Sequence, residues 1–271
     1  MSLEAEHQQT EPALIAELVD RYAIYQQAVQ SPDLDVELIK DLYFQCRQRS
    51  AHHLREDFCG TAAILAEWIR HGHEFSGEGF DNDPEPLEWG KRNNFDPLGM
   101  DKNRATLHLA DVREPSLRHP DVRCAFNFSY WVFRTRQEMI EYFRCCYQDL
   151  APDGVLLLDS HGGFESLIEE ESEADMGDFI SVWHQTNICP VDNTADLAIH
   201  YRFPDGSEIH NAYQYRWRIW SLPEILEILI EAGFSSSRVF WYEEDDEGSR
   251  YIETDTGRND PAWIACIAAL K

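Results

Sequence analysis

Two acidic positions separated by a turn of small residues form the clearest chemical pattern in this 271-residue chain. The segment Arg55-Glu56-Asp57-Phe58-Cys59-Gly60-Thr61 precedes an apolar helix pattern, and Asp81 follows about twenty residues after the turn. A helix that begins at such a turn directs free backbone N–H groups toward the anionic part of a ligand. A carboxylate at the end of the next strand accepts hydrogen bonds from ribose hydroxyls. The spacing therefore predicts a strand–turn–helix–strand unit that binds a nucleotide-like ligand.

The glycine content of the turn narrows the choice of ligand. A dinucleotide pyrophosphate needs the pattern G-x-G-x-x-G, whereas this turn holds the single glycine Gly60. The turn suits a smaller group, such as the aminocarboxypropyl tail of S-adenosylmethionine. Here the chain resembles the class I S-adenosylmethionine-dependent methyltransferases, whose first motif is commonly acid-x-G-C-G-T-G. It departs from that motif at Phe58 and Ala62, which replace the first and third glycines, and the motif acid is either Glu56 or Asp57.

The resemblance implies a role for residues near the ends of the first four strands. Arg55 is expected to neutralise the carboxylate of the cofactor's tail, and Asp81 to bind both ribose hydroxyls. Asp111 and the backbone N–H of Val112 are expected to meet the adenine ring. The whole set expected around the cofactor, with the last two residues at its methionine portion, is Arg55, Asp57, Phe58, Cys59, Gly60, Thr61, Asp81, Asn82, Asp111, Val112, Asn127 and Phe128.

Methyl transfer is an in-line displacement at a sulfonium, so the protein contributes mainly alignment and electrostatics. A general base is needed only if the acceptor is protonated at the working pH. The candidates are Tyr130, His161 and His184, and the sequence leaves open whether any of them acts. The pair His71-Gly72-His73 has no acidic or cysteine companions at ligand spacing, so no metal site is predicted.

The elements that must position these residues alternate between helices and strands. Periodicity and caps predict helices over 13–30, 32–47, 61–70, from 84 onward, 135–150 and 221–233. Strands are expected over 53–58, 75–81, 105–110, 123–129, 155–159, 236–242 and 262–269. Such alternation gives an α/β fold with a doubly wound, mostly parallel sheet. The resemblance implies a Rossmann-like sheet of seven strands whose last strand is antiparallel.

Residues 163–220 break the alternation. Short alternating segments at 179–185, 198–203 and 208–217, with Asp205-Gly206 as a hairpin turn, predict a small antiparallel insert after strand five. The insert is expected to cover the methyl acceptor, as in glycine and amino-sugar N-methyltransferases. The residues expected to contact the acceptor, from the N-terminal helix and the insert, are Tyr22, Tyr25, Trp183, Tyr213 and Arg216.

The chain therefore divides into four parts. An N-terminal helical cap is expected at 1–50 and the cofactor-binding βα units at 51–162. The insert occupies 163–220, and a final helix with two strands completes the sheet at 221–271.

The charge of the chain bears on its partners. A net charge of −27 opposes binding to nucleic acid, and no basic cluster offsets it. The acidic runs Glu165–Asp178 and Glu243–Glu247 are interpreted as solvated loops or helix faces.

The cysteines and the apolar runs bear on the compartment. Seven cysteines without a C-x-x-C pair predict reduced thiols and neither disulfides nor structural zinc. No apolar run suits a bilayer and Met1–Pro12 shows no signal peptide, so a cytoplasmic location is expected. The oligomeric state, including a homodimer, stays open.

The hypothesis that joins these patterns is an S-adenosylmethionine-dependent methyltransferase that modifies a nitrogen or oxygen atom of a small molecule. One alternative is an NAD-linked Rossmann oxidoreductase, which shares the acid after strand two but requires more glycines. Another is a non-catalytic module that keeps the fold and binds a ligand or partner. Phe58 and Ala62, in place of motif glycines, keep that last alternative open.

Overall fold

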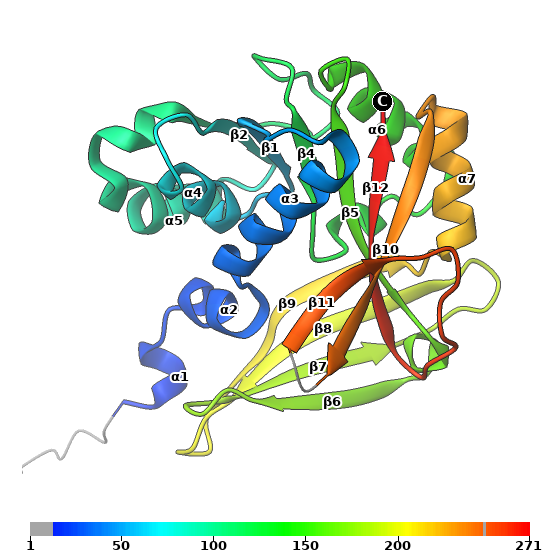
Figure 1. The fold of residues 1–271 in the computed structure, drawn as a ribbon. Helices are drawn as coiled ribbons and strands as arrows, with labels where there is room; N and C mark the ends of the chain where they lie inside the picture. Colours follow the sequence, from blue (N-terminus) through cyan, green and yellow to red (C-terminus); the bar gives the residue numbers. More distant parts are fainter. Residues whose placement is uncertain (1–12, 246–247) are drawn as a thin grey trace, which may run out of the picture.

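The fold consists of two β-sheets, with helices on both faces of the larger one (Figure 1). A computed structural model describes residues 13–245 and 248–271. The segment Met1–Pro12, expected to carry no signal peptide, lies outside the described residues, as do Asp246 and Glu247 of the second acidic run.

The large sheet has the order β11-β10-β12-β5-β4-β1-β2-β3. Strands β1 to β5 are parallel, whereas β12 runs antiparallel to both of its neighbours, β5 and β10. The expected seven strands and the antiparallel last strand are confirmed. An eighth strand, β11, was not predicted and pairs with β10 in an antiparallel hairpin. The strands are β1 (His53–Asp57), β2 (Ser76–Asp81), β3 (Ala105–Leu109), β4 (Val122–Ala125), β5 (Val155–Gly162), β10 (Ser236–Asp245), β11 (Gly248–Glu253) and β12 (Trp263–Leu270).

Helices cover both faces of this sheet and bury a separate core on each. On one face α3 and α4 pack against the strands, and on the other α6 and α7 do so. Capping boxes begin α6 at Thr135 and α7 at Ser221, and Gly233 ends α7 in a left-handed conformation, as the sequence predicts. The helices are α3 (Pro32–Arg47), α4 (Ala63–Arg70), α5 (Pro84–Gly90), α6 (Arg136–Asp149) and α7 (Leu222–Ala232), with short helical turns at η1 (Lys91–Phe95), η2 (Asp96–Arg104), η3 (Ser129–Val132) and η4 (Phe164–Leu167).

The N-terminal helical region differs from the single helix expected over 13–30. It is split into α1 (Ile15–Leu18) and α2 (Arg21–Val29). The break occurs at Asp20, whose carboxylate accepts hydrogen bonds from the backbone N–H groups of Tyr22 and Ala23 and so begins a new helix. Because the apolar spacing continues across Asp20, it predicted one continuous helix rather than a new helix start.

The insert is a separate four-stranded antiparallel sheet in the order β6-β7-β8-β9 (Figure 1). Its strands are β6 (Glu170–Asp175), β7 (Ile180–Thr186), β8 (Thr194–Arg202) and β9 (Glu208–Arg218). The turn at Gly206, where φ is 82°, closes the hairpin between β8 and β9 as predicted. The acidic run Glu165–Asp178, expected as a loop or helix face, instead supplies the edge strand β6, whose six residues are all exposed.

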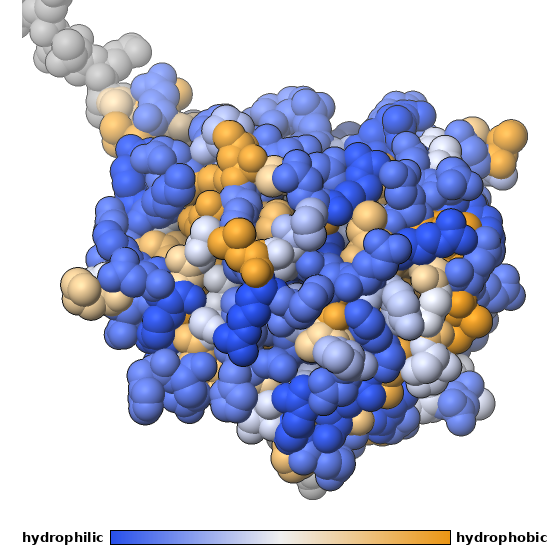
Figure 2. Space-filling model, turned by 90° about the horizontal axis from the view of Figure 1, so that it is seen from above, coloured by the Kyte–Doolittle hydropathy of each residue, from blue (hydrophilic) through white to orange (hydrophobic). Residues whose placement is uncertain are grey.

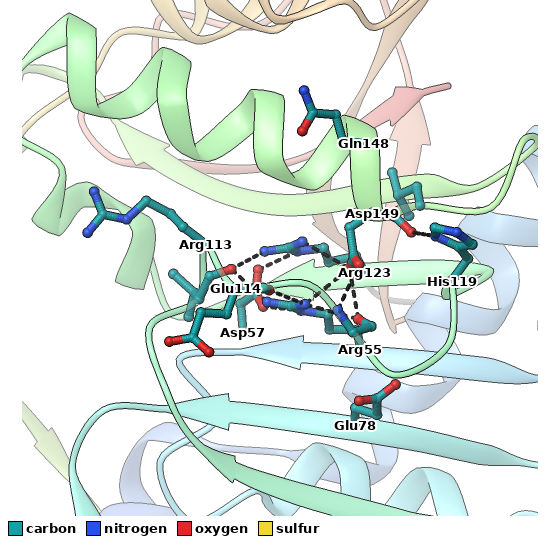
Figure 3. A network of polar contacts seen from close by, with 12 residues as sticks. Arg55, Asp57, Glu78, Arg113, Glu114, His119, Arg123, Gln148 and Asp149 are labelled. Atoms are coloured by element: carbon teal, nitrogen blue, oxygen red, sulfur yellow. Dashed lines mark hydrogen bonds and ion pairs between the residues drawn. The ribbon is translucent and has the colours of Figure 1, made fainter.

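The connection from β3 to β4 contains no helix within residues 110–121, all of which the structure describes. Its backbone lies against buried charged side chains instead (Figure 3). The guanidinium groups of Arg55 and Arg123 donate to the carbonyl of Val112, while Asp149 and Glu78 accept N–H groups from residues 116–118. A loop over a sheet needs such partners, because buried backbone groups without hydrogen bonds are costly.

The surface fits the high content of charged residues. Seen from above Figure 1, it is mostly hydrophilic, with hydrophobic side chains in small separate groups (Figure 2). Within the described ranges, none of the helices combines the length and the apolar character needed to cross a membrane.

Candidate cofactor and acceptor site

A cavity of about 500 Å³ lies where the carboxyl ends of β1, β2 and β4 meet α2 and β9. This edge of an open parallel sheet is the usual place for a ligand. The cavity joins the large sheet to the insert, so both halves of the predicted site contribute to it. Its lining comprises Arg21, Tyr22, Tyr25, Gln30, Phe58, Cys59, Gly60, Thr61, Asp81, Asp83, Pro86, Asn127, Ser129, Val132, Asn211, Ala212, Tyr213, Gln214, Tyr215 and Trp217.

The turn after β1 keeps left-handed backbone geometry at all three motif glycine positions. The φ angles are 53° at Phe58, 52° at Gly60 and 52° at Ala62. Phe58 and Ala62 therefore replace the glycines without changing the sign of φ, at a cost in strain that surrounding contacts must offset. A Cβ built on Gly60 would meet no atom within 4 Å, so space for a ligand is open at that residue.

Asp81 links the end of β2 to this turn. Its carboxylate accepts the backbone N–H of Gly60 at 2.7 Å and that of Asp83 at 2.9 Å. Burial raises the pKa of Asp81, while these N–H donors favour its ionised form. Asp83 in turn begins α5 by accepting the N–H of Glu85 at 2.9 Å. Asn82, predicted beside Asp81, does not line the cavity.

Thr61 fixes the far side of the turn to two other elements. Its hydroxyl accepts a 2.6 Å hydrogen bond from the side-chain amide of Gln26 on α2. Its carbonyl accepts one of 2.8 Å from the amide of Asn94 in η1. The N-terminal helix is thus attached directly to the predicted cofactor turn.

The segment after β4 is the third wall of the cavity. Asn127 and Phe128 are both left-handed, with φ of 56° and 57°, and their N–H groups donate to the carboxylate of Asp159. Asn127 and Ser129 line the cavity. The Phe128 ring instead packs against His161, with ring centroids 4.5 Å apart, and Phe128 does not line the cavity.

Aromatic side chains from α2 and β9 pack against one another and form the remaining wall of the cavity. The rings of Tyr25 and Tyr213 lie 4.6 Å apart, and Tyr22 lies 6.3 Å from Tyr213. The Tyr213 hydroxyl donates to the carbonyl of Arg21 at 3.2 Å. The three tyrosines predicted to contact the acceptor are therefore brought together, and Tyr215 and Trp217 extend the same wall.

Arg55 is not placed to neutralise a ligand carboxylate. Its side chain has no exposed surface and donates to Asp57, Asp149 and the carbonyl of Val112. Asp57 is buried in the same network, where it accepts the Tyr142 hydroxyl at 2.8 Å. The alternation of β1 explains this result, since Arg55 and Asp57 share one side of the strand, which packs against the 110–121 loop.

The expected adenine-binding pair also lies outside the cavity lining. Asp111 forms a 2.7 Å ion pair with Arg113, which lowers the pKa of Asp111. Val112 is buried, and its carbonyl is held by Arg55 and Arg123. Their predicted contacts with adenine stay predictions.

The general-base candidates are distributed away from the cavity lining. Tyr130 is fully buried and donates to the carbonyl of Asp159, and burial raises its pKa. His161 is stacked on Trp131 with centroids 4.6 Å apart, and burial lowers its pKa to about 4. In the insert, Nδ1 of His184 lies 3.3 Å from Nε2 of His200.

Two predicted acceptor contacts are placed elsewhere. Trp183 packs on Trp217, with ring centroids 6.2 Å apart, and does not line the cavity. Arg216 forms an ion pair with Asp196 and borders a second cavity, of about 600 Å³, beside β8 and β9.

Several lining residues were missed by the sequence analysis. Tyr215 and Trp217 follow Tyr213 at the period of two that places strand residues on one face, and that signal would have found them. Arg21 and Asp83 carried no sequence signal for a ligand. Within residues 13–245 and 248–271, no three His, Cys, Asp or Glu side chains are arranged to hold a metal ion.

Solved structures of several methyltransferases share this fold. One, from Clostridium acetobutylicum ATCC 824, has a TM-score of 0.65 and 15% identity over 91% of this chain and 96% of its own. CalS10, an amino pentose methyltransferase from Micromonospora echinaspora, has a TM-score of 0.64 and 18% identity over 98% of this chain and 100% of its own. The sugar N-methyltransferase KedS8 from Streptoalloteichus sp ATCC 53650 has a TM-score of 0.60 and 14% identity over 98% of each chain.

These likenesses establish the class I S-adenosylmethionine-dependent methyltransferase fold for this chain. No protein-family model and no curated protein matches its sequence.

Proposed function

We propose that this protein is an S-adenosylmethionine-dependent methyltransferase that acts on a small molecule. The observation that carries the proposal is the hydrogen bond between Asp81 and Gly60, two residues that line a cavity together with several aromatic side chains. An acid at the end of β2, an open turn after β1 and a group of aromatic side chains line the same cavity. The structures that share the fold are methyltransferases, and CalS10 is described with the cofactor bound.

The chain's own residues fit the cofactor at three points. The open side of Gly60 accommodates its amino-acid tail, and the Asp81 carboxylate accepts its ribose hydroxyls through lone pairs not used by backbone N–H groups. Asn127 and Ser129 border the space left for its methionine portion. When bound, S-adenosylmethionine supplies the electrophilic methyl group, and the protein holds the two reactants in line.

The acceptor atom is best assigned as an amine nitrogen. Neither His nor Lys is among the residues that line the cavity, and burial raises the pKa of Tyr25, Tyr213 and Tyr215. Asp81 and Asp83 already accept backbone N–H groups. A hydroxyl acceptor needs a base in its transition state, whereas a neutral amine attacks with its own lone pair. Tyrosine faces also attract a cationic amine, which must release its proton to solvent before the nitrogen attacks.

Binding and turnover together test the proposal. Isothermal titration calorimetry should show saturable binding of S-adenosylmethionine and S-adenosylhomocysteine, with much weaker binding of NAD. A panel of small amines and matched alcohols, assayed for S-adenosylhomocysteine, should give turnover with an amine. Binding of NAD alone would favour an oxidoreductase, and cofactor binding without turnover across the panel would favour a non-catalytic module. Turnover with alcohols only would reverse the assignment to nitrogen.

A further inference from the structure

Two consecutive residues at the cavity hold an uncommon backbone conformation. Asn127 and Phe128 have φ of 56° and 57°. Asparagine enters the left-handed region readily, but a bulky residue such as phenylalanine does so rarely and at a cost in backbone strain. Something in the surrounding structure must hold Phe128 in this state.

The carboxylate of Asp159 on β5 meets both residues. One oxygen accepts the N–H of Asn127 at 2.7 Å, and the other accepts that of Phe128 at 2.9 Å. Successive backbone N–H groups in a turn can point to the same side and so create a concave site for an anion. Here the anion is a side chain of the protein itself.

Two further contacts hold Asp159 in place. Its own carbonyl accepts the hydroxyl of buried Tyr130 at 2.9 Å, and its strand is paired with β12 through Cys266. No Lys, Arg or His side chain of the described chain forms an ion pair with its carboxylate, so the two N–H groups are its identified donors. The Asp159 carboxylate is therefore held in place, and it stabilises the turn by accepting the N–H groups of Asn127 and Phe128.

The result of this contact is seen at Asn127. The residue lines the cavity, and its side-chain amide makes no hydrogen bond to other described residues. The neighbouring Phe128 ring is turned away into the contacts with Trp131 and His161. Asn127 therefore borders the cavity with a side-chain amide that is available to a ligand.

We infer that Asp159 is a positioning residue for methyl transfer, which by holding Asn127 and Phe128 in the left-handed conformation presents the Asn127 amide to the cofactor's methionine portion. The inference rests on the proposed function. It assigns Asp159 no contact with either reactant, since its effect passes through the backbone of the turn.

The test uses S-adenosylhomocysteine as the probe, with calorimetry on the full chain. Asp159→Asn removes one acceptor and should weaken binding by roughly ten- to one-hundred-fold. Replacing Phe128 with glycine removes the penalty for left-handed φ, so the double variant Asp159→Asn/Phe128→Gly should regain a large part of the affinity. A general loss of stability would not be rescued in this way.

Glu78→Gln provides a matched control. Glu78 is also buried and also accepts two successive backbone N–H groups, from Leu117 and Arg118, but it does not line the cavity. This variant should lose stability while its affinity for S-adenosylhomocysteine stays near that of the unaltered protein. An equal loss of affinity in both variants would overturn the inference.

A measurement without ligand covers the case in which Asp159→Asn does not fold. In ¹⁵N-labelled unaltered protein, the amide protons of Asn127 and Phe128 should resonate downfield and exchange slowly, as donors to a buried carboxylate. Ordinary shifts and fast exchange would overturn the inference. If the unaltered protein binds S-adenosylhomocysteine and Asp159→Asn binds it equally, this inference alone fails. If the unaltered protein binds neither form of the cofactor, the proposed function fails.

Discussion

The carboxylate of Asp81 accepts the backbone N–H of Gly60 at 2.7 Å, and this bond joins the carboxyl ends of β1 and β2. The two strands are parallel neighbours. Asp57 of β1 is paired with Phe80 of β2, the residue directly before Asp81. The acid expected to bind ribose therefore also holds the turn expected to bind the amino-acid tail. The two halves of the cofactor would be recognised by a single unit.

Asp81→Ala should weaken binding of S-adenosylhomocysteine by roughly 1.5–3 kcal/mol, because a charged hydrogen-bond acceptor is lost at the ribose and at Gly60. Calorimetry measures the change. Asp101→Ala serves as a control, since Asp101 is an exposed acid in η2 that forms an ion pair with Arg104. Equal affinity of the Asp81 variant and the unaltered protein would show that Asp81 only organises the backbone at Gly60 and Asp83.

Tyr213→Ala should raise the KM for the amine acceptor by about two- to tenfold, because it removes one ring of the aromatic wall. The dissociation constant of S-adenosylhomocysteine should change little, since Tyr213 contacts α2 rather than the turn after β1. Steady-state kinetics with an amine identified in the panel measures both effects. Tyr147→Ala is the control, because Tyr147 packs on Phe234 at 5.5 Å and does not line the cavity. A loss of cofactor affinity without change in acceptor KM would contradict the assignment of this wall.

Arg55→Met should lower the free energy of unfolding by about 3–5 kcal/mol, because it leaves the buried carboxylates of Asp57 and Asp149 with one cation, Arg123. Urea denaturation measures the loss. Arg113→Met, on the 110–121 loop that covers Arg55, is the control, since its ion pair with Asp111 is exposed and should contribute about 1 kcal/mol or less. A selective loss of cofactor affinity with unchanged stability would restore the role first expected of Arg55.

The stability of the protein should fall as the pH rises from about 4.5 to 8, in part because of Glu56. Burial raises the pKa of Glu56 to about 8, although the hydrogen bond that its carboxylate accepts from the N–H of Leu65 acts to lower it. The folded protein therefore holds a proton that the unfolded chain has released, so its stability declines through this window. Glu56→Gln should remove that decline, by an amount on the order of a few kcal/mol across the window.

Urea denaturation of both proteins at several pH values measures the difference. Glu88→Gln, at an exposed position of α5, should leave the pH dependence unaltered. A constant difference between Glu56→Gln and the unaltered protein would show that Glu56 is ionised in the folded state.

Most of the fold was predictable because its signals are local. The capping boxes at Thr135 and Ser221 and the hairpin turn at Gly206 each fix a boundary through contacts within a few residues. The strand β11 escaped prediction because its sequence, Gly248–Glu253, is polar and gains order by pairing with β10. The cap at Asp20 was hidden by apolar spacing that continued across it.

Gly60 and Asp81 could be predicted as cavity-lining residues because their spacing along the chain places both at the carboxyl ends of neighbouring strands. Arg55 was misplaced because its role depends on which side of β1 faces the ligand, and a buried arginine has no distinctive sequence pattern. Asp159 was missed for a related reason. Its partners are backbone groups of residues 127 and 128, about thirty residues earlier, and no spacing rule connects them.

The buried charges beneath the 110–121 loop also bear on how the protein responds to salt. Arg55 and Arg123 face Asp57 and Asp149 in a layer whose formal charges cancel, so the excess of acid in this chain lies elsewhere. Counterions screen charges in water far more than charges in the interior, and the Debye length shrinks from about 30 Å at 0.01 M to about 8 Å at 0.15 M. Raising the ionic strength should therefore relieve repulsion among exposed carboxylates without weakening the buried layer. The melting temperature of the protein is expected to climb with added sodium chloride.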